Sequence, residues 1–250
     1  MTEKLDGAKI KLTLAYDGSD FHGWQVQKGG DITVQSTLQE AIFKVCGKNL
    51  PVTGCSRTDA GVHANEFVCH TDMINIPCEK LPIALNTHLP RSVAVKSAQM
   101  VPSDFHARYS CIGKEYIYKI LNSKIRDPFL CGRVMQYPRP LDVDALCAIA
   151  PAFCGKKDFC AFMAQGSKIV DTVRTVKYCQ ISREGDMVTM RIAADGFLYN
   201  MVRIIAGTFI LAAEKGFSAG DIKDIIASHE RCRAGATAPA CGLYLNKVFY

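Results

Sequence analysis

The chain has 250 residues, of which 48% are hydrophobic and 22% are charged. This composition is that of an ordinary globular protein with one large core or two smaller ones, and it excludes a fibrous or largely disordered chain. The formal net charge of +6 permits a polyanionic partner such as a nucleic acid. A solvated basic surface accounts for so mild an excess as well, so charge alone does not assign a partner.

The sequence favours a cytoplasmic location. The first seven residues, MTEKLDG, contain neither the apolar stretch nor the small-residue cleavage site of a secretory signal. The longest nearly apolar run, residues 204–213, is far shorter than the roughly 20 residues that span a membrane. None of the twelve cysteines belongs to a Cys-x-x-Cys pair. We therefore expect a reducing compartment in which most cysteines are small buried side chains.

In chain order, the first elements are a strand, a helix and further strands. Apolar residues alternate over residues 10–16 and predict a half-buried strand. Helical spacing then predicts a helix over residues 34–45, with Thr33 as its N-cap and Gly47 as its end. Four more strands are predicted, at residues 52–55, 67–71, 93–100 and 114–121.

The second part of the chain repeats this mixture. A helix is predicted from Asp142 to about Gly155, and a nearly all-apolar segment predicts a buried helix over residues 199–215. A hairpin, a short helix and a closing strand complete the set, at residues 175–193, 222–226 and 243–250. Strands and helices mix without a regular β-α alternation, which favours an α+β fold with a mainly antiparallel sheet.

Several cofactor and metal motifs are excluded. No Gly-Lys pair is followed by Ser or Thr, so the sequence contains no P-loop, and no G-x-G-x-x-G follows a predicted strand. A zinc nucleobase deaminase needs H-x-E and P-C-x-x-C, whereas His63 is followed by Ala-Asn-Glu and Cys78 by Glu-Lys-Leu. His63, His70, His106 and Cys69 could still cluster in space, but scattered residues of these types are more often structural. We expect neither a cofactor nor a metal.

The segment that carries chemistry is residues 54–64, GCSRTDAGVHA. It is a polar loop between two predicted strands, and Arg57 precedes Asp59 by two residues. Residues two apart in an extended chain point to the same side. A guanidinium there favours the ionised carboxylate that a nucleophile or base requires. Spacing alone favours a simpler interpretation, a surface turn that holds a weak ion pair.

This segment resembles the active-site motif of the TruA family of tRNA pseudouridine synthases, whose usual form is GRTDAGVH. Other segments resemble the family in the same order along the chain. They are YDGS from residue 16, FHGWQ from 21, VQ from 34, DFHARYS from 104, KEYIY from 114, DF from 158, TVRT from 172, MVR from 201 and GLYL from 242.

The resemblance implies an isomerase that converts uridine to pseudouridine in the anticodon stem-loop of tRNA. Asp59 matches the catalytic aspartate of the family. The N-glycosidic bond breaks, the uracil rotates, and C5 is joined to the ribose. Two routes are open: attack of Asp59 on the base or sugar, or abstraction of a ribose proton to give a glycal. Neither route needs a metal or a cofactor.

Four further residues match substrate-binding positions of the family. Arg57 matches the arginine that enters the base stack when the target nucleotide flips out. Tyr116 matches the tyrosine that stacks on the flipped uracil, and Arg203 matches the arginine paired with the catalytic aspartate. Leu245 matches a residue that packs under the base, although a plain core leucine fits its position as well.

Two residues depart from the family pattern. Ser56 stands where the family usually has Gly or Ala, and Met163 stands where many relatives carry Arg, which removes one presumed RNA contact. Neither departure touches Asp59.

The resemblance also implies the architecture. It implies two ferredoxin-like or RRM-like α+β domains, residues 1–105 and 106–250, whose sheets join beneath a basic RNA-binding cleft, and it implies a homodimer. Because the target uridines lie within a folded RNA, recognition is expected to depend on shape and phosphate contacts more than on base reading. The main alternative is a non-catalytic tRNA-binding protein or chaperone on the same fold, and the second is a zinc-dependent nucleic-acid enzyme.

Overall fold

The predicted first strand, β1 (Lys9–Tyr16), lies at the centre of one sheet, and its side chains alternate between buried and half-buried as expected. β1 pairs antiparallel with β3 (His63–Asp72) on one side and with β4 (Val93–Val101) on the other. β2 (Val52–Gly54) pairs antiparallel with β3. The computed structural model describes residues 8–167 and 169–250. The start of the chain, for which we predict no secretory signal, lies outside the described residues.

The contacts divide the chain into two units. The first comprises residues 1–112 and 245–250, and the second comprises residues 113–244. The closing strand β10 (Leu243–Phe249) thus ends in the first unit, where it follows β3 in the strand order. There the amide of Asn65 donates to the amide oxygen of Asn246 at 2.8 Å.

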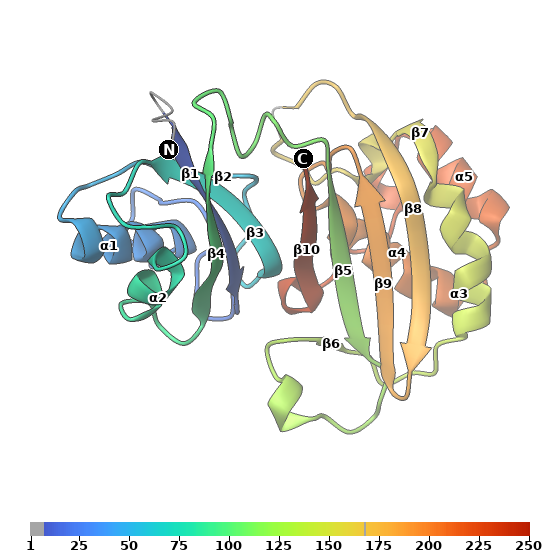
Figure 1. The fold of residues 1–250 in the computed structure, drawn as a ribbon. Coiled ribbons are helices and arrows are strands. Elements are labelled where there is room, and N and C mark those ends of the chain that lie inside the picture. Colours follow the sequence, from blue (N-terminus) through green and yellow to red (C-terminus); the bar gives the residue numbers. More distant parts are fainter. Residues whose placement is uncertain (1–7, 168) are drawn as a thin grey trace. The chain divides into compact units, whose positions relative to one another are not determined.

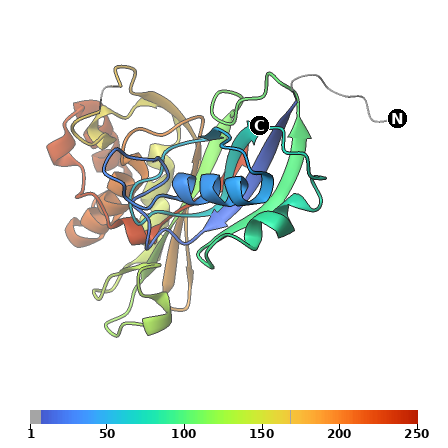
Figure 2. The same cartoon turned by 90° about the vertical axis from the view of Figure 1, so that its left-hand side faces the viewer.

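Two helices accompany the sheet of the first unit. α1 (Val34–Cys46) begins at Thr33, whose side chain accepts from the Ser36 amide, and ends at Gly47 in a left-handed conformation, as predicted. α2 (Leu81–Asn86) was not predicted; it is only six residues long and has a proline in its first turn. Both helices lie on one face of the strands, and α1 runs across them (Figures 1 and 2).

The second unit has a sheet with the order β5-β9-β8-β7. The hairpin of β8 (Val173–Glu184) and β9 (Met187–Ala194) confirms the predicted one, and β9 also pairs antiparallel with β5 (Gly113–Leu121). The remaining strands are β6 (Met135–Gln136), parallel to β5, and β7 (Gly155–Asp158). The helices are α3 (Val143–Ile149), α4 (Met201–Lys215) and α5 (Ala219–Ser228). Short 3-10 turns occur at Pro128–Leu130, Ala150–Phe153, Cys160–Phe162, Arg231–Arg233 and Ala240–Gly242.

The structure confirms the α+β class with mainly antiparallel pairing and corrects three boundaries. β3 begins at His63 and not at residue 67, because Ala64 already pairs with Tyr16. α3 ends at Ile149, where the chain tightens into a 3-10 turn that contains Pro151. α4 begins two residues later than predicted, because Asn200 adopts a left-handed conformation with φ of 59°.

The prediction that most cysteines are buried is wrong. All twelve are free thiols, but only Cys55, Cys69 and Cys179 are buried. Within the part of the chain that the structure describes, no helix is long and apolar enough to cross a membrane.

Candidate active site

The segment that carries the family motif connects β2 to β3 and is held against the loop that follows β1. The backbone amide of Trp24 donates to the carbonyl oxygen of Thr58 at 3.1 Å, and the amide of Gly61 donates to the carbonyl of Phe21 at 3.3 Å. The hydroxyls of Tyr16 and Thr58 lie 2.9 Å apart in a buried hydrogen bond. The backbone on each side of Asp59 is therefore fixed by main-chain contacts.

Two glycines allow the loops to approach so closely. A Cβ atom on Gly18 would lie 2.0 Å from the carbonyl oxygen of Val62, and one on Gly23 would lie 2.4 Å from that of Thr58. Gly23 also has a φ of +82°, which side chains rarely adopt. The glycines of the YDGS and FHGWQ segments are thus required by backbone-to-backbone contact with the motif loop.

A buried histidine fixes the end of the motif. The amide of Gly18 donates to Nδ1 of His63 at 3.0 Å. The same nitrogen lies 3.1 Å from a carboxylate oxygen of Asp17. That oxygen also accepts from the amide and the hydroxyl of Ser19. His63, which opens β3, is therefore a structural residue of this loop contact.

Asp59 itself is half-buried, whereas Arg57 is exposed. The carbonyl oxygen of Asp59 accepts from the amide of Val62 at 3.1 Å, and Gly61 has a φ of +74°. This tight turn leads directly into β3. The carboxylate is thus carried on a short turn whose two ends are anchored.

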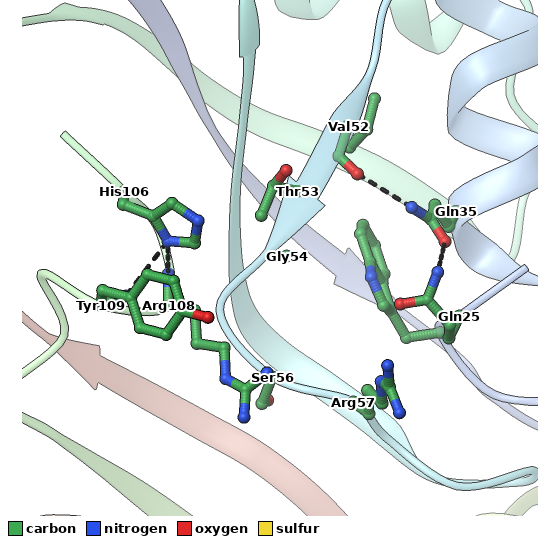
Figure 3. A pocket seen from close by; sticks show the side chains of 11 residues that line it. Gln25, Gln35, Val52, Thr53, Gly54, Ser56, Arg57, His106, Arg108 and Tyr109 are labelled. Atoms are coloured by element: carbon green, nitrogen blue, oxygen red, sulfur yellow. Dashed lines mark hydrogen bonds between the residues drawn. The ribbon is translucent and has the colours of Figure 1, made fainter. Parts of the chain in front are cut away.

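A pocket of about 290 Å³ adjoins the motif within the first unit (Figure 3). Arg57 and Ser56 line one part of it, and Asp59 is not among its lining residues. The other lining residues are Trp24, Gln25, Gln35, Val52, Thr53, Gly54, His106, Arg108 and Tyr109. Arg57 therefore faces a concave, polar surface that the sequence did not predict.

One wall of the pocket is the turn that contains the HARYS sequence. The backbone amides of Arg108 and Tyr109 donate to Nδ1 of His106 at 3.1 and 3.2 Å. His70 of β3 lies beneath this turn, and its Nδ1 accepts from the amide of Ala107 at 3.1 Å. The hydroxyl of Tyr250 donates to the carbonyl of Ala107 at 2.7 Å. The turn is thus rigidly attached to the sheet.

The stability of the fold should depend on the protonation of His70. Burial, together with the nearby charges of Lys9 and His106, lowers the pKa of His70 to about 4, although Asp72 opposes the shift. The unfolded chain binds this proton near pH 6.5, so the contribution of His70 to stability should fall as the pH falls from about 6.5 to about 4 and should be constant above that window. The expected loss is on the order of 3 kcal/mol.

This dependence can be measured by urea unfolding between pH 4.5 and 8. A His70→Asn variant, whose side-chain oxygen can still accept from Ala107, should lose less stability over the same range. Parallel pH profiles for the two proteins would contradict the assignment.

Tyr116 and Arg203 belong to the second unit. Tyr116 is a buried residue of β5, and its ring meets the edge of Phe197 with centroids 5.1 Å apart. Arg203 lies in the first turn of α4, where Nε donates to the carbonyl of Ala238 at 2.8 Å and Nη1 donates to the side-chain oxygen of Asn200 at 3.0 Å. These oxygen acceptors partly offset the cost of desolvating the half-buried arginine.

Leu245, a fully buried residue of β10, belongs to the first unit. Of the residues that depart from the family pattern, Ser56 is half-buried beside the pocket, and Met163 is half-buried at the end of a 3-10 turn.

Sequence reasoning missed a buried acid next to Tyr116. Glu115 is only 2% exposed, and its carboxylate accepts a short hydrogen bond from the hydroxyl of Tyr178 and one from Arg191 at 3.3 Å. Burial and the adjacent carboxylate raise the pKa of Tyr178 to about 12. An acidic residue inside an alternating apolar strand is the signal that could have indicated this contact.

Comparison with known proteins identifies the family. The family model described as tRNA pseudouridine synthase matches residues 13–110 and 149–250. The chain is 43% identical to tRNA pseudouridine synthase A of Ruminiclostridium cellulolyticum over 97% of this chain and 99% of the relative. It is 43% identical to the enzyme of the same name from Thermoanaerobacter sp., over 96% and 99%. The chain belongs to the TruA family of tRNA pseudouridine synthases.

As a member of the TruA family, the protein is an isomerase that converts uridine to pseudouridine in tRNA. The matched ranges include Arg57, Asp59, Arg203 and Leu245, whereas Tyr116 lies between them. Likeness to a solved structure is much weaker. A Cbf5-Nop10-Gar1 complex aligns with 94% of this chain and 57% of its own at 11% identity, and the TM-score of 0.37 is too low to support a conclusion.

No group of three or more His, Cys, Asp or Glu side chains among the described residues could hold a metal ion. His63 and His70 are instead engaged by backbone amides.

Proposed function

We propose that Asp59 is the catalytic residue of this tRNA pseudouridine synthase and that it acts on uridines of the anticodon stem-loop. The observation that carries this proposal is the anchored motif turn, because a carboxylate held on both sides by main-chain contacts is positioned before substrate binds. The half-buried state of Asp59 leaves it accessible to a nucleotide.

The reaction exchanges one bond for another. The bond between N1 and C1′ breaks, the uracil rotates, a bond between C5 and C1′ forms, and the C5 hydrogen is released to solvent while N1 gains a proton. Asp59 contributes either as a nucleophile toward the base or sugar, or as the base that removes a ribose proton. Both routes use the ionised carboxylate beside the sugar.

The motif match supports roles for four other residues. We propose that Arg57 takes the place of the flipped nucleotide in the RNA stack, since its guanidinium is flat, charged and exposed. Tyr116 is proposed to stack on the uracil, Arg203 to pair with Asp59, and Leu245 to pack under the base. Those three proposals rest on the family resemblance.

The resemblance also supports the finer architecture: ferredoxin-like or RRM-like domains over residues 1–105 and 106–250, a basic cleft for the RNA, a homodimer and a cytoplasmic location. Sedimentation of the free protein and of its complex with tRNA tests the homodimer directly. A monomer at micromolar concentration in both states would contradict it.

The proposed target can be tested with tRNA transcripts. Wild-type enzyme should release tritium from transcripts labelled at C5 of uridine, and a pseudouridine-selective chemical probe should place the products in the anticodon stem-loop. Products confined to other arms of the tRNA would reject the proposed target while leaving the family activity intact.

The exposed guanidinium of Arg57 offers a test of nucleotide flipping. Arg57→Ala should slow single-turnover tritium release by roughly tenfold to a hundredfold. In this variant no side chain fills the gap that the flipped nucleotide leaves in the RNA stack, so the lost stacking energy is not compensated. Arg57→Lys keeps the positive charge but lacks the planar guanidinium that can stack on bases, and it should show an intermediate rate. Unfolding should be unchanged in both variants because the side chain is exposed. An unaltered single-turnover rate in Arg57→Ala would exclude the role.

A further inference from the structure

The pocket beside the motif loop has the chemistry of a nucleotide site. Arg57 and Arg108 are its charged residues, and none of the described residues that line it is acidic. Tyr109 is 76% exposed, so its ring is accessible to a stacking partner. The volume of about 290 Å³ lies just below the range of small-ligand pockets, roughly 300–1,000 Å³, so the pocket is large enough for at most one nucleotide.

The aromatic wall is preorganised. The ring of Tyr109 lies against the imidazole of His106 with centroids 4.3 Å apart and planes tilted by 30°. The guanidinium carbon of Arg108 lies 5.7 Å from the centre of the Tyr109 ring. His106 is supported in turn by His70, whose ring is 5.0 Å away. A base that stacks on Tyr109 therefore meets a ring that is already fixed, which lowers the entropic cost of binding.

The opposite wall offers a hydrogen-bond acceptor. Oε1 of Gln35 accepts from the backbone amide of Val26 at 2.8 Å and from Nε2 of Gln25 at 2.6 Å. This network fixes the orientation of both amides. The side-chain amide oxygen of Gln25 faces the pocket (Figure 3). There it can accept a hydrogen bond from a base N–H or a ribose hydroxyl.

We propose that this pocket binds one nucleotide of the tRNA other than the uridine being isomerised, with its base stacked on Tyr109 and its phosphate held by Arg108. The proposal rests on the proposed action on tRNA. The nucleotide is distinct from the target because Asp59 does not line the pocket. Stacking on an exposed aromatic ring beside a cation is a common mode of binding for an unpaired nucleotide.

Variants of the two exposed residues test the site. Tyr109→Ala should raise the Kd for tRNA roughly tenfold to a hundredfold, whereas Tyr109→Phe should bind like wild type because the ring remains. Arg108→Ala should reduce the slope of log Kd against log salt by about one. At saturating enzyme, single-turnover tritium release should fall by less than about threefold in each variant, since the lost contact is made equally before and during the reaction.

The nucleotide is identified by an abasic scan. Transcripts that each lack one non-target base are tested for binding to wild type and to Tyr109→Ala. At one position, removal of the base should weaken binding to wild type but should not weaken binding to Tyr109→Ala any further. This result is expected when the missing base and the substitution remove the same contact.

The outcomes separate the two proposals. If wild type releases no tritium from anticodon uridines, the proposed target fails whatever the pocket does. If wild type is active there and Tyr109→Ala binds tRNA within twofold of wild type, the pocket proposal alone is overturned. Equal losses in Tyr109→Phe and Tyr109→Ala, or an abasic scan in which no position depends on Tyr109, would overturn it as well.

Discussion

Asp59→Asn is expected to reduce tritium release from C5-labelled tRNA by at least about 10³-fold, the scale on which loss of a nucleophile or base lowers turnover. The amide has the shape of the carboxylate but can neither attack nor accept a proton at neutral pH. The main-chain bonds of Thr58 and Gly61 do not involve the side chain, so the turn should keep its conformation.

Binding separates the catalytic effect from a structural one. The Kd of Asp59→Asn for tRNA should stay within about threefold of wild type, since most affinity comes from phosphate contacts elsewhere. Asp20→Asn is a matched control, because it removes an exposed carboxylate from the adjoining loop and changes the net charge equally. Comparable activity of the two variants would refute the assignment of Asp59.

Gly23→Ala is expected to have the second largest effect. The new Cβ would lie 2.4 Å from the carbonyl oxygen of Thr58, and main-chain atoms cannot yield as a flexible side chain can. Overpacking of this kind costs roughly 1–3 kcal/mol, and the left-handed backbone adds about 1–2 kcal/mol. The displaced turn should also lower turnover by about a hundredfold, because small shifts of a catalytic group are costly.

The chain offers a matched control for this substitution. Gly30 has a φ of +79°, close to the +82° of Gly23, but a Cβ there would meet nothing within 4 Å. Gly30→Ala should therefore show the backbone strain alone, with normal turnover. Urea unfolding and tritium release are measured for both variants. The difference between Gly23→Ala and Gly30→Ala in stability and in turnover is then the effect of the close contact with Thr58. Equal destabilisation would show that close approach to Thr58 contributes nothing.

Periodicity predicted the elements that have strong local signals. α1 was predicted together with its caps at Thr33 and Gly47, and the hairpin of β8 and β9 followed from alternation on either side of a glycine turn. The start of β3 was missed because His63 and Ala64 look like loop residues. Ala64 pairs with Tyr16 of β1, and His63 accepts from the amide of Gly18; both contacts are distant in sequence.

The motif loop was recognised from its residues, but its support was not. That Gly18 and Gly23 touch the backbone of residues 58–62 depends on tertiary approach, which no local pattern encodes. The HARYS turn is part of the family resemblance, but its place beside Arg57 follows from the attachment of Ala107 to His70 and Tyr250. The roles of Asp59 and the other site residues stay predictions.

The buried contact of Glu115 with Tyr178 and Arg191 has a consequence for folding. Neighbouring residues of a strand face opposite sides, so a slip of β5 by one position would exchange Glu115 with the aromatic Tyr116. The slipped strand would bury a carboxylate without its partners and would be strongly disfavoured. We therefore expect Glu115 to favour the native register of β5 over a register shifted by one residue.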